Sequence, residues 1–301
     1  MPSRATAYRV SMPNFPPGAL IDLHTHSNHS DGTEPPAVVV EQAARAGLDV
    51  VALTDHDVVS GWDEADRAGQ EHGVVVVPGI EVSCNHERIS VHLLAYLPDG
   101  RDRTLLEELS ASRASRDGRL RRMVELLAAD GYPVTYEEVL GVAEKDASLG
   151  RPHIADVLVR HGVYETRDQA FGGVLASSSP YYVAYHVLDP VRMTELVVRA
   201  GGVPVMAHPF ASSRGRVVGD ALIERMTDAG LVGLEVDHRD HGPAERRHAA
   251  ELADRLGLLR TGSSDYHGTG KLNRLGENTT DPAVLEEILR RATGSGLLGA
   301  V

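Results

Sequence analysis

The chain has 301 residues, enough for one large α/β domain or a domain with an insertion, and its 30 basic and 43 acidic residues give a net charge of −13. This acidic balance argues against broad binding to nucleic-acid backbones, including duplex DNA, because such binding needs a basic surface. The apolar runs are only as long as strands and we see no apolar signal segment, so we predict no membrane association, and the single cysteine, Cys84, favours a cytoplasmic location.

Strands and helices alternate along most of the chain, after an extended, proline-rich lead-in over residues 1–19. The predicted strands, which are apolar runs that end in polar residues, cover 19–24, 49–54, 74–77, 89–96, 203–207, 233–236 and 259–262. The predicted helices, bounded by proline, serine or glycine, cover 35–47, 60–73, 190–200, 220–230, 243–257 and 282–293, with Ser60 expected to cap the second. Such alternation implies a parallel sheet or barrel, whose strand ends gather binding sites.

The alternation of predicted strands and helices is interrupted between residues 100 and 188. Residues 103–131 read as one long, charged helix, and the loop-rich helical sequence behind it contains no predicted strand. We interpret residues 100–188 as a helical insertion that covers one mouth of a barrel built from residues 20–99 and 189–301.

His, Asp and Glu residues stand at the ends of six predicted strands. His24 and His26 are two residues apart, so their side chains lie on the same face of a strand, and Asp31 follows in a turn. Asp265 and His267 repeat this spacing near the C-terminus. Taken singly, a His-x-His pair is more often a polar strand end than a metal site, and an isolated histidine in an apolar run is more often a hydrogen-bonded core residue.

The joint pattern favours a metal centre over these separate explanations. Nine imidazole and carboxylate groups brought together by a barrel would form a costly buried polar cluster without cations between them. Imidazoles and carboxylates without thiolates suit two or three Mn, Fe or Zn ions better than Ca or Mg; Cys84 is read as a small buried residue. The predicted metal ligands are His24, His26, Asp31, His56, Glu81, His92, His208, Asp265 and His267.

These motifs resemble those of the PHP (polymerase and histidinol phosphatase) superfamily over about residues 20–295. The matching segments are His24-Thr25-His26 with Ser30-Asp31-Gly32, Thr54-Asp55-His56, Ala207-His208-Pro209 and Ser264-Asp265-Tyr266-His267, with Glu81 and His92 at positions between them. The resemblance implies a distorted (β/α)7 barrel with a multinuclear metal centre. It assigns one ion to His24, His26, Glu81 and Asp265, a second to Glu81, His92 and His208, and a third to Asp31, His56 and His267.

Clustered divalent ions lower the pKa of bound water, so the expected nucleophile is a metal-bridging hydroxide rather than a serine or cysteine side chain. Asp57, next to His56, is interpreted as a turn residue. The remaining histidines are expected at surface or structural positions: His29, His72, His86, His161, His186, His238, His241 and His248.

Within the superfamily the likeness is to enzymes that act on nucleoside 3′,5′-bisphosphates and on the 5′ ends of short RNA. Such enzymes carry a helical insertion in the same place, an arginine-rich helix start and an Arg-Pro-His segment. The corresponding residues here are Arg113, Arg116 and Arg119, at helical spacing, and Arg151-Pro152-His153.

Guanidinium groups suit a phosphate that is bound but not cleaved, because they meet it through two parallel hydrogen bonds. The alternative for these arginines is a solvated face of a charged helix, which we expect for Arg121 and Arg122. His153 is a candidate to protonate the leaving oxygen or to bind phosphate, and the sequence leaves both roles open.

The sequence therefore predicts a phosphoesterase for nucleoside 3′,5′-bisphosphates, with short RNA as a further substrate and no particular oligomeric state. One alternative is a related phosphoesterase for histidinol phosphate or a cyclic sugar phosphate. Another is a non-catalytic PHP module, such as those attached to polymerases. The complete ligand set and the lack of polymerase sequence disfavour this last alternative.

Overall fold

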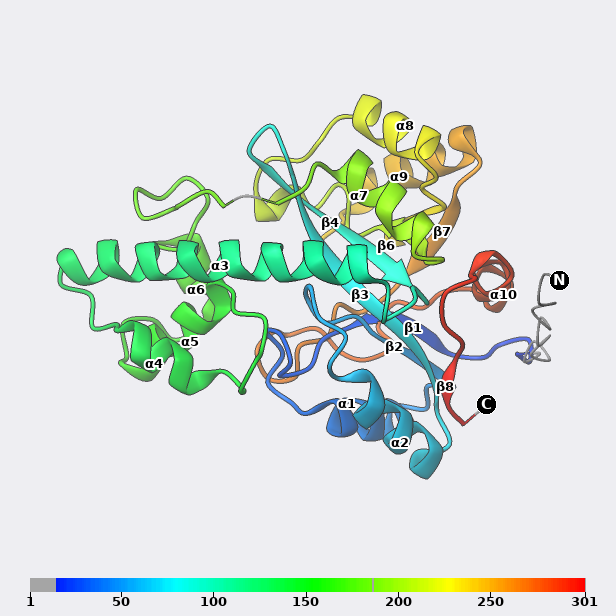
Figure 1. Cartoon of the computed structure of the whole chain (residues 1–301), viewed down its shortest axis with the longest axis horizontal. Coiled ribbons are helices and arrows are strands. Elements are labelled where there is room, and N and C mark those ends of the chain that lie inside the picture. Colours follow the sequence, from blue (N-terminus) through cyan, green and yellow to red (C-terminus); the bar gives the residue numbers. More distant parts are fainter. Residues whose placement is uncertain (1–14, 186, 301) are drawn as a thin grey trace, which may run out of the picture.

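The computed structural model describes residues 15–185 and 187–300, and in that part of the chain seven strands form a nearly closed barrel (Figure 1). In sequence order they are β1 (Ile21–Thr25), β2 (Val50–Leu53), β3 (Val75–His86), β4 (Ile89–Tyr96), β5 (Val203–Met206), β6 (Gly233–Asp237) and β7 (Leu259–Gly262). Each strand pairs with the next, and a bridge between Thr25 and Tyr266 joins the first strand to the segment after the last. The predicted seven-stranded α/β barrel is confirmed.

The fourth strand departs from the expected parallel order. β4 runs antiparallel to both β3 and β5, whereas β1, β2 and β3 are parallel to one another, as are β5, β6 and β7. β3 is also much longer than the predicted strand over residues 74–77, because its second half forms a hairpin with β4. The two-residue turn of this hairpin, Glu87 and Arg88, has positive φ at both positions, as tight hairpin turns require.

Helices cover the outside of the barrel (Figure 1). α1 (Pro36–Arg45) and α2 (Trp62–His72) pack together on one side, and α7 (Pro190–Arg199), α8 (Asp220–Asp228) and α9 (Pro243–Leu256) lie on another. α10 (Pro282–Arg291) packs near β7. Proline in the first turn, where a missing N–H costs nothing, explains the starts of α1, α7, α9 and α10.

One predicted detail is wrong. Gly61, not Ser60, stands at the N-cap of α2, and the Ser60 hydroxyl instead lies 2.7 Å from Nδ1 of His29. After α10, residues 298–299 form a short strand, β8 (Leu298–Gly299), which pairs antiparallel with the start of β3. Gly69 and Gly299 allow this pairing, because a Cβ on Gly69 would lie 2.6 Å from the Gly299 Cα.

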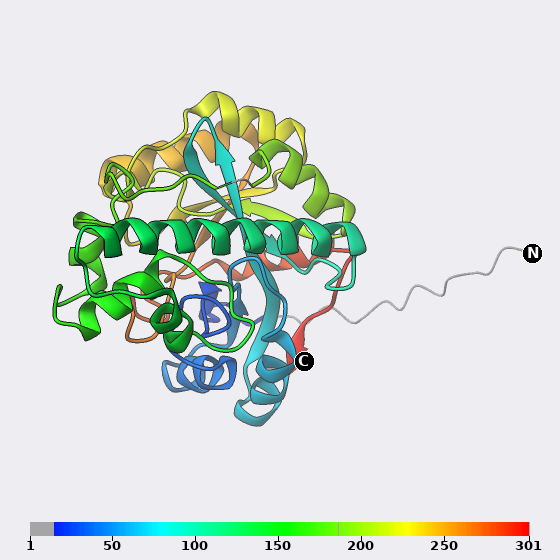
Figure 2. The same cartoon turned by 60° about the vertical axis from the view of Figure 1, so that its left-hand side comes forward.

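The region after β4 is helical, with α3 (Arg103–Ala129), α4 (Tyr136–Val142), α5 (Arg151–Arg160) and α6 (Arg167–Gly172). Figures 1 and 2 show α3 crossing the molecule from the barrel to the three short helices. Leu105 and Leu109, in its first half, pack into the core of the barrel, whereas Met123 and Leu127 pack with Ile154 in a separate core. A separate core is what an insertion over residues 100–188 would have, and the bounds of that insertion stay a prediction.

No helix in the described ranges is both long and apolar enough to span a membrane. Most of the predicted lead-in over residues 1–19, and His186, lie outside the described residues. Phe15 and Ala19, at the end of that lead-in, are buried against the barrel core.

Candidate metal centre and phosphate site

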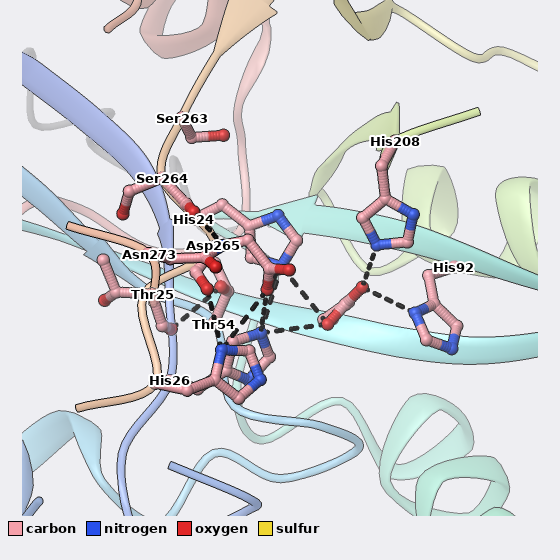
Figure 3. A network of polar contacts seen from close by, with 12 residues as sticks. His24, Thr25, His26, Thr54, His92, His208, Ser263, Ser264, Asp265 and Asn273 are labelled. Carbon is pink, nitrogen blue, oxygen red and sulfur yellow. Dashed lines mark hydrogen bonds and ion pairs between the residues drawn. The ribbon is translucent and has the colours of Figure 1, made fainter. Parts of the chain in front are cut away.

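Imidazoles and carboxylates from six of the barrel strands, or from the residues just after them, converge in one buried cluster, part of which is shown in Figure 3. β1 contributes His24 and His26, whose side chains are fully buried. Because β4 is antiparallel, His92 in its first half meets the second half of β3 rather than its start. The nine predicted ligands are thus brought together by the strand order.

Glu81 of β3 lies at the centre of the cluster, in the middle of its strand rather than at the predicted end. Each of its oxygens contacts several imidazoles. Oε2 is 3.2 Å from Nε2 of His24, 3.0 Å from Nε2 of His26 and 3.4 Å from Nδ1 of His56, and Oε1 is 2.7 Å from Nδ1 of His92 and 3.1 Å from Nε2 of His208. This carboxylate can therefore bridge two cations.

Three sets of ligand atoms lie within 4.8 Å of one another and could each hold an ion. They are His24, His26, Glu81 and Asp265; His26, Asp31 and His56; and His56, Glu81 and His92. The sets are linked, because His26, His56 and Glu81 each belong to two of them.

Asp31 and His267 show why this cluster fits cations. Asp31 Oδ1 and His267 Nε2 are buried and form no hydrogen bond, although they lie 3.2 Å apart. Asp31 Oδ2 is 3.9 Å from Nε2 of His56. Buried polar atoms without hydrogen bonds are costly, and a divalent ion between imidazole and carboxylate ligands removes that cost.

Glu81, His208 and His267 have charge states that suit metal binding, whereas neighbouring carboxylates overcome the effect of burial and raise the pKa of His24 and His26. Burial opposes ionisation of Glu81, but the imidazoles of His56 and His92 lower its pKa well below the ordinary value. Burial, with Arg214 nearby, lowers the pKa of His208 to about 3, and burial lowers the pKa of His267 to about 4. Ionised carboxylates beside neutral imidazoles are the forms that coordinate metals.

Sequence reasoning missed Glu235, which lies in β6 and is fully buried. Its Oε1 is 3.0 Å from Nδ1 of His24 and accepts a hydrogen bond from the Ser263 hydroxyl, and its Oε2 accepts one from the His208 backbone N–H at 2.7 Å. A carboxylate on the far nitrogen of a metal-binding histidine fixes its tautomer and orientation. The signal in the sequence was a single acidic residue inside a short apolar strand.

His238 is also closer to the cluster than expected. It is fully buried, and its Nδ1 accepts the Asp240 N–H at 3.0 Å, which places the ring hydrogen on Nε2. That nitrogen lies 3.5 Å from Oδ2 of Asp265 without a hydrogen bond. Arg214 and Lys271, likewise missed, contact the same oxygen.

Asp57 is more than the turn residue that we predicted. Its backbone has a positive φ of 55°, as in a turn, but its carboxylate is buried. It accepts hydrogen bonds from the Ser83 N–H and hydroxyl at 2.8 Å each and from the Ser112 hydroxyl of α3 at 3.2 Å. Oδ2 also lies 3.6 Å from Nε of Arg116, so Asp57 ties α3 to the barrel.

Two of the three predicted arginines on α3 are buried rather than solvated. Arg116 and Arg119 have buried guanidinium nitrogens without hydrogen-bond partners. The guanidinium carbon of Arg119 lies 4.9 Å and 4.6 Å from the ring centroids of Tyr182 and Tyr185. Arg116 also donates through Nη1 to the Ser148 hydroxyl at 3.4 Å, so what remains unused is a set of buried guanidinium N–H groups, which suit an anionic ligand.

Arg113 also has a buried Nε without a hydrogen-bond partner, whereas Arg121 and Arg122 differ. Arg113 is half-buried and lines a small cavity with Asp57 and Leu109. Arg121 and Arg122 are more than half exposed, as predicted, and pair with acidic residues of their own helix.

Arg151 and His153 lie in the first turn of α5. Arg151 donates to the Leu175 carbonyl at 2.7 Å, and its guanidinium carbon lies 5.5 Å from the Tyr182 ring centroid. His153 is buried, and its Nδ1 accepts the Gly150 N–H at 3.0 Å. We call Arg116, Arg119 and Arg151, with Tyr182 and Tyr185, the arginine–tyrosine cluster.

Comparisons with known proteins agree with this geometry. A family model described as the PHP domain matches residues 22–157. A 3′,5′-nucleoside bisphosphate phosphatase from Chromobacterium violaceum is 32% identical over 273 residues, which cover 90% of this chain and 96% of that protein. A phosphoribosyl 1,2-cyclic phosphate 1,2-diphosphodiesterase from Eggerthella lenta is 34% identical, covering 82% of this chain and 94% of its own.

The fold is shared with solved structures. A crystal structure from Bifidobacterium adolescentis, described as a proposed metal-dependent phosphoesterase, is 41% identical with a TM-score of 0.89. The match covers 93% of this chain and 98% of that one. The similarity therefore includes the barrel and the helices between β4 and β5.

Proposed function

Because this chain belongs to the PHP family and is a hydrolase of phosphate esters, we propose that it removes one phosphate from nucleoside 3′,5′-bisphosphates. The observation that carries this proposal is a second cationic site beside the predicted metal ligands. Nε of Arg116 lies 3.6 Å from Oδ2 of Asp57, the residue next to the predicted metal ligand His56. A substrate with two phosphates can therefore occupy both sites at once.

The predicted ligands would hold two or three divalent ions, with Mn, Fe or Zn favoured by the imidazole content. We assign His24, His26, Glu81 and Asp265 to one ion, Glu81, His92 and His208 to a second, and Asp31, His56 and His267 to a third. When bound, such ions activate a water as the nucleophile and neutralise the charge that develops on the phosphate oxygens.

The arginine–tyrosine cluster would bind the phosphate that is not cleaved. Tyr182 and Tyr185 both contact the guanidinium of Arg119, at 4.9 Å and 4.6 Å from its carbon to their ring centroids, and restrict its rotation, so it is oriented before substrate arrives. Arg116 is oriented by its ion pair with Asp57.

For His153, the geometry favours phosphate binding over proton donation. Since its Nδ1 accepts a backbone N–H, the ring is neutral with its hydrogen on Nε2, and burial lowers its pKa. A neutral imidazole donates a hydrogen bond to a phosphate oxygen but is a poor acid.

Phosphate release from adenosine 3′,5′-bisphosphate by the Mn-loaded protein tests the proposal. We expect Arg116→Ala and Arg119→Ala to reduce kcat/KM on bisphosphates about 10- to 100-fold while sparing a nucleoside monophosphate. Arg122→Ala, on an exposed part of the same helix, is the matched control. No release from the bisphosphate would contradict the proposal. A 5′-phosphorylated short RNA in the same assay tests the predicted second substrate.

A cyclic sugar phosphate is the second candidate, favoured by the similarity to the Eggerthella lenta diphosphodiesterase. The substrate in that protein's name carries a phosphate on its ribosyl group besides the cyclic phosphate. A ribose 1,2-cyclic phosphate has one phosphorus centre, so its hydrolysis would not need the arginine–tyrosine cluster. A ribose 1,2-cyclic phosphate and histidinol phosphate belong in the same screen. Hydrolysis of either at equal rates by the parent and by Arg119→Ala would favour this candidate, whereas a protein that holds less than one ion per chain would favour a non-catalytic module.

A further inference from the structure

The two carboxylate oxygens of Asp265 have different surroundings. Oδ1 lies 3.5 Å from Nε2 of both His24 and His26, on the side of the other predicted ligands. Oδ2 instead lies 2.6 Å from Nη2 of Arg214 and 3.0 Å from Nζ of Lys271. One oxygen therefore belongs to the metal-ligand cluster and the other to a pair of cations.

These cations come from separate segments of the chain. Arg214 ends a short 3-10 helix, η1 (Ser212–Arg214), after β5, and its Nε lies 2.5 Å from Oδ2 of Asp240. The guanidinium therefore bridges two carboxylates, which fixes its orientation. Lys271 lies in the segment after β7. His238 lies in the segment after β6, and its buried Nε2 is 3.5 Å from the same oxygen of Asp265.

The backbone of Asp265 is held independently. Its φ of 54° is uncommon for a residue with a side chain. The preceding Ser264 donates its N–H to Asp22 at 3.0 Å. Its carbonyl oxygen accepts a hydrogen bond from Asn273 at 2.7 Å, and Figure 3 labels both of these residues. With the backbone fixed, rotation of the carboxylate is the main freedom left to Asp265.

We propose that Arg214 and Lys271 are positioning residues that hold Oδ2 of Asp265, so that this aspartate offers only Oδ1 to a metal ion; the inference rests on the proposed metal centre. A carboxylate with both oxygens free could chelate one ion or rotate between two. Hydrogen-bonded partners behind a ligand restrict this choice, and their loss typically costs 10- to 100-fold in metal affinity.

Metal affinity tests the inference directly. Protein loaded with Mn or Zn is dialysed against graded chelator, and the metal left per chain is measured by elemental analysis. We expect Arg214→Met and Lys271→Met each to weaken retention of one ion about 10-fold, and the double variant about 100-fold. Arg214→Lys, which keeps a cationic donor, should restore most of the affinity. Arg239→Met is the matched control, since Arg239 is an ion-paired arginine whose carboxylate partner, Glu277, is outside the cluster.

Thermal unfolding of each metal-free variant distinguishes a loss of metal affinity from a loss of folding. If the double variant is unfolded, metal retention by the single variant Lys271→Met tests the inference instead. Parent affinity in both single variants and in the double variant would overturn the inference while leaving the proposed function intact. A parent protein that retains no metal would overturn both. Equal losses in Arg214→Met and Arg214→Lys would also contradict it, because size rather than the donor would then matter.

Discussion

At the scale of single residues, His24 shows how the cluster prepares a ligand. Its Nδ1 faces Glu235 at 3.0 Å and its Nε2 faces Glu81 at 3.2 Å. Burial opposes ionisation of Glu235, but His24 and His238 lower its pKa far below the ordinary value, so it accepts a hydrogen bond from Nδ1. The lone pair of Nε2 is then directed at the metal-ligand cluster.

We expect Glu235→Gln to weaken metal retention and phosphate release about 10- to 100-fold, because an amide no longer fixes the ring of His24 and cannot accept at both of its atoms. Elemental analysis and the phosphate-release assay measure these losses. Glu277→Gln, at a partly exposed carboxylate paired with Arg239, is the control. An unchanged metal content would mean that Glu235 only packs the barrel.

Sequence patterns identify residues whose partners are near in the chain. His24 with His26, and Asp265 with His267, are predictable because a spacing of two places both side chains on one side of an extended backbone. Glu235 has no such local partner. Its role depends on His24, which is more than two hundred residues away in the sequence. Only the closure of the barrel brings the two side chains together.

At the scale of elements, the loop after β1 depends on a close backbone approach. Gly32 follows Asp31, and a Cβ at this position would lie 2.5 Å from the carbonyl oxygen of His26. A glycine is therefore required if the loop is to return Asp31 to the cluster. This gives a physical reason for the Ser30-Asp31-Gly32 motif.

Gly32→Ala should displace Asp31 and reduce the bound metal by the ion assigned to Asp31, His56 and His267, since no flexible side chain can move to make room. The metal-to-chain ratio measures the change. Gly118→Ala, on the open surface of α3 with nothing near its Cβ position, should leave the ratio unchanged and slightly stabilise the helix. A full metal complement in Gly32→Ala would show that the loop adapts.

The join between α3 and the barrel depends on Asp57. Asp57→Ala removes the acceptor that Ser112 and Arg116 share, and it leaves Arg116 free to rotate. We expect KM for the bisphosphate to rise about 10-fold with little change in kcat, because the loss falls on binding of the uncleaved phosphate. Steady-state kinetics measures this, with Ser112→Ala as the milder comparison. A fall in kcat at constant KM would instead mean that Asp57 acts on the predicted metal ligand His56 rather than on Arg116.

Elements with strong local signals are predicted to within a few residues. α7, α9 and α10 begin at the prolines that mark them, and β4 spans its predicted range. The length of β3 and the direction of β4 are not predictable in this way, because both depend on a hairpin within a sheet that is otherwise built from crossovers. β8 consists of two residues and has no periodicity to detect.

At the scale of the whole molecule, the cluster couples metal content to stability. Burial opposes protonation of His26, but Asp265 and Glu81 raise its pKa to about 9 in the metal-free protein, against about 6.5 in an unfolded chain. Its protonation therefore stabilises the metal-free fold fully below pH 6.5, and that contribution is lost as the pH rises through 9. A bound ion replaces this positive charge at every pH in the range.

The difference in Tm between metal-loaded and chelator-treated protein should therefore widen from pH 6.5 to pH 9. Thermal unfolding after dialysis, which removes free ions, measures the difference. His248→Gln, at a half-exposed histidine outside the cluster, should show the same widening as the parent. A difference that stays constant with pH would mean that His26 is neutral in the metal-free protein.

The bridge between Thr25 and Tyr266 has a consequence for how the protein is made. His24 emerges from the ribosome early, and Asp265 and His267 emerge roughly 12 to 50 s later at ordinary rates of synthesis. Until then the barrel is open and Asp265, one of the four ligands assigned to the first ion, does not exist. The predicted ligand set is complete only after His267 has been synthesised, so we expect metal ions to bind to a closed barrel rather than to the growing chain.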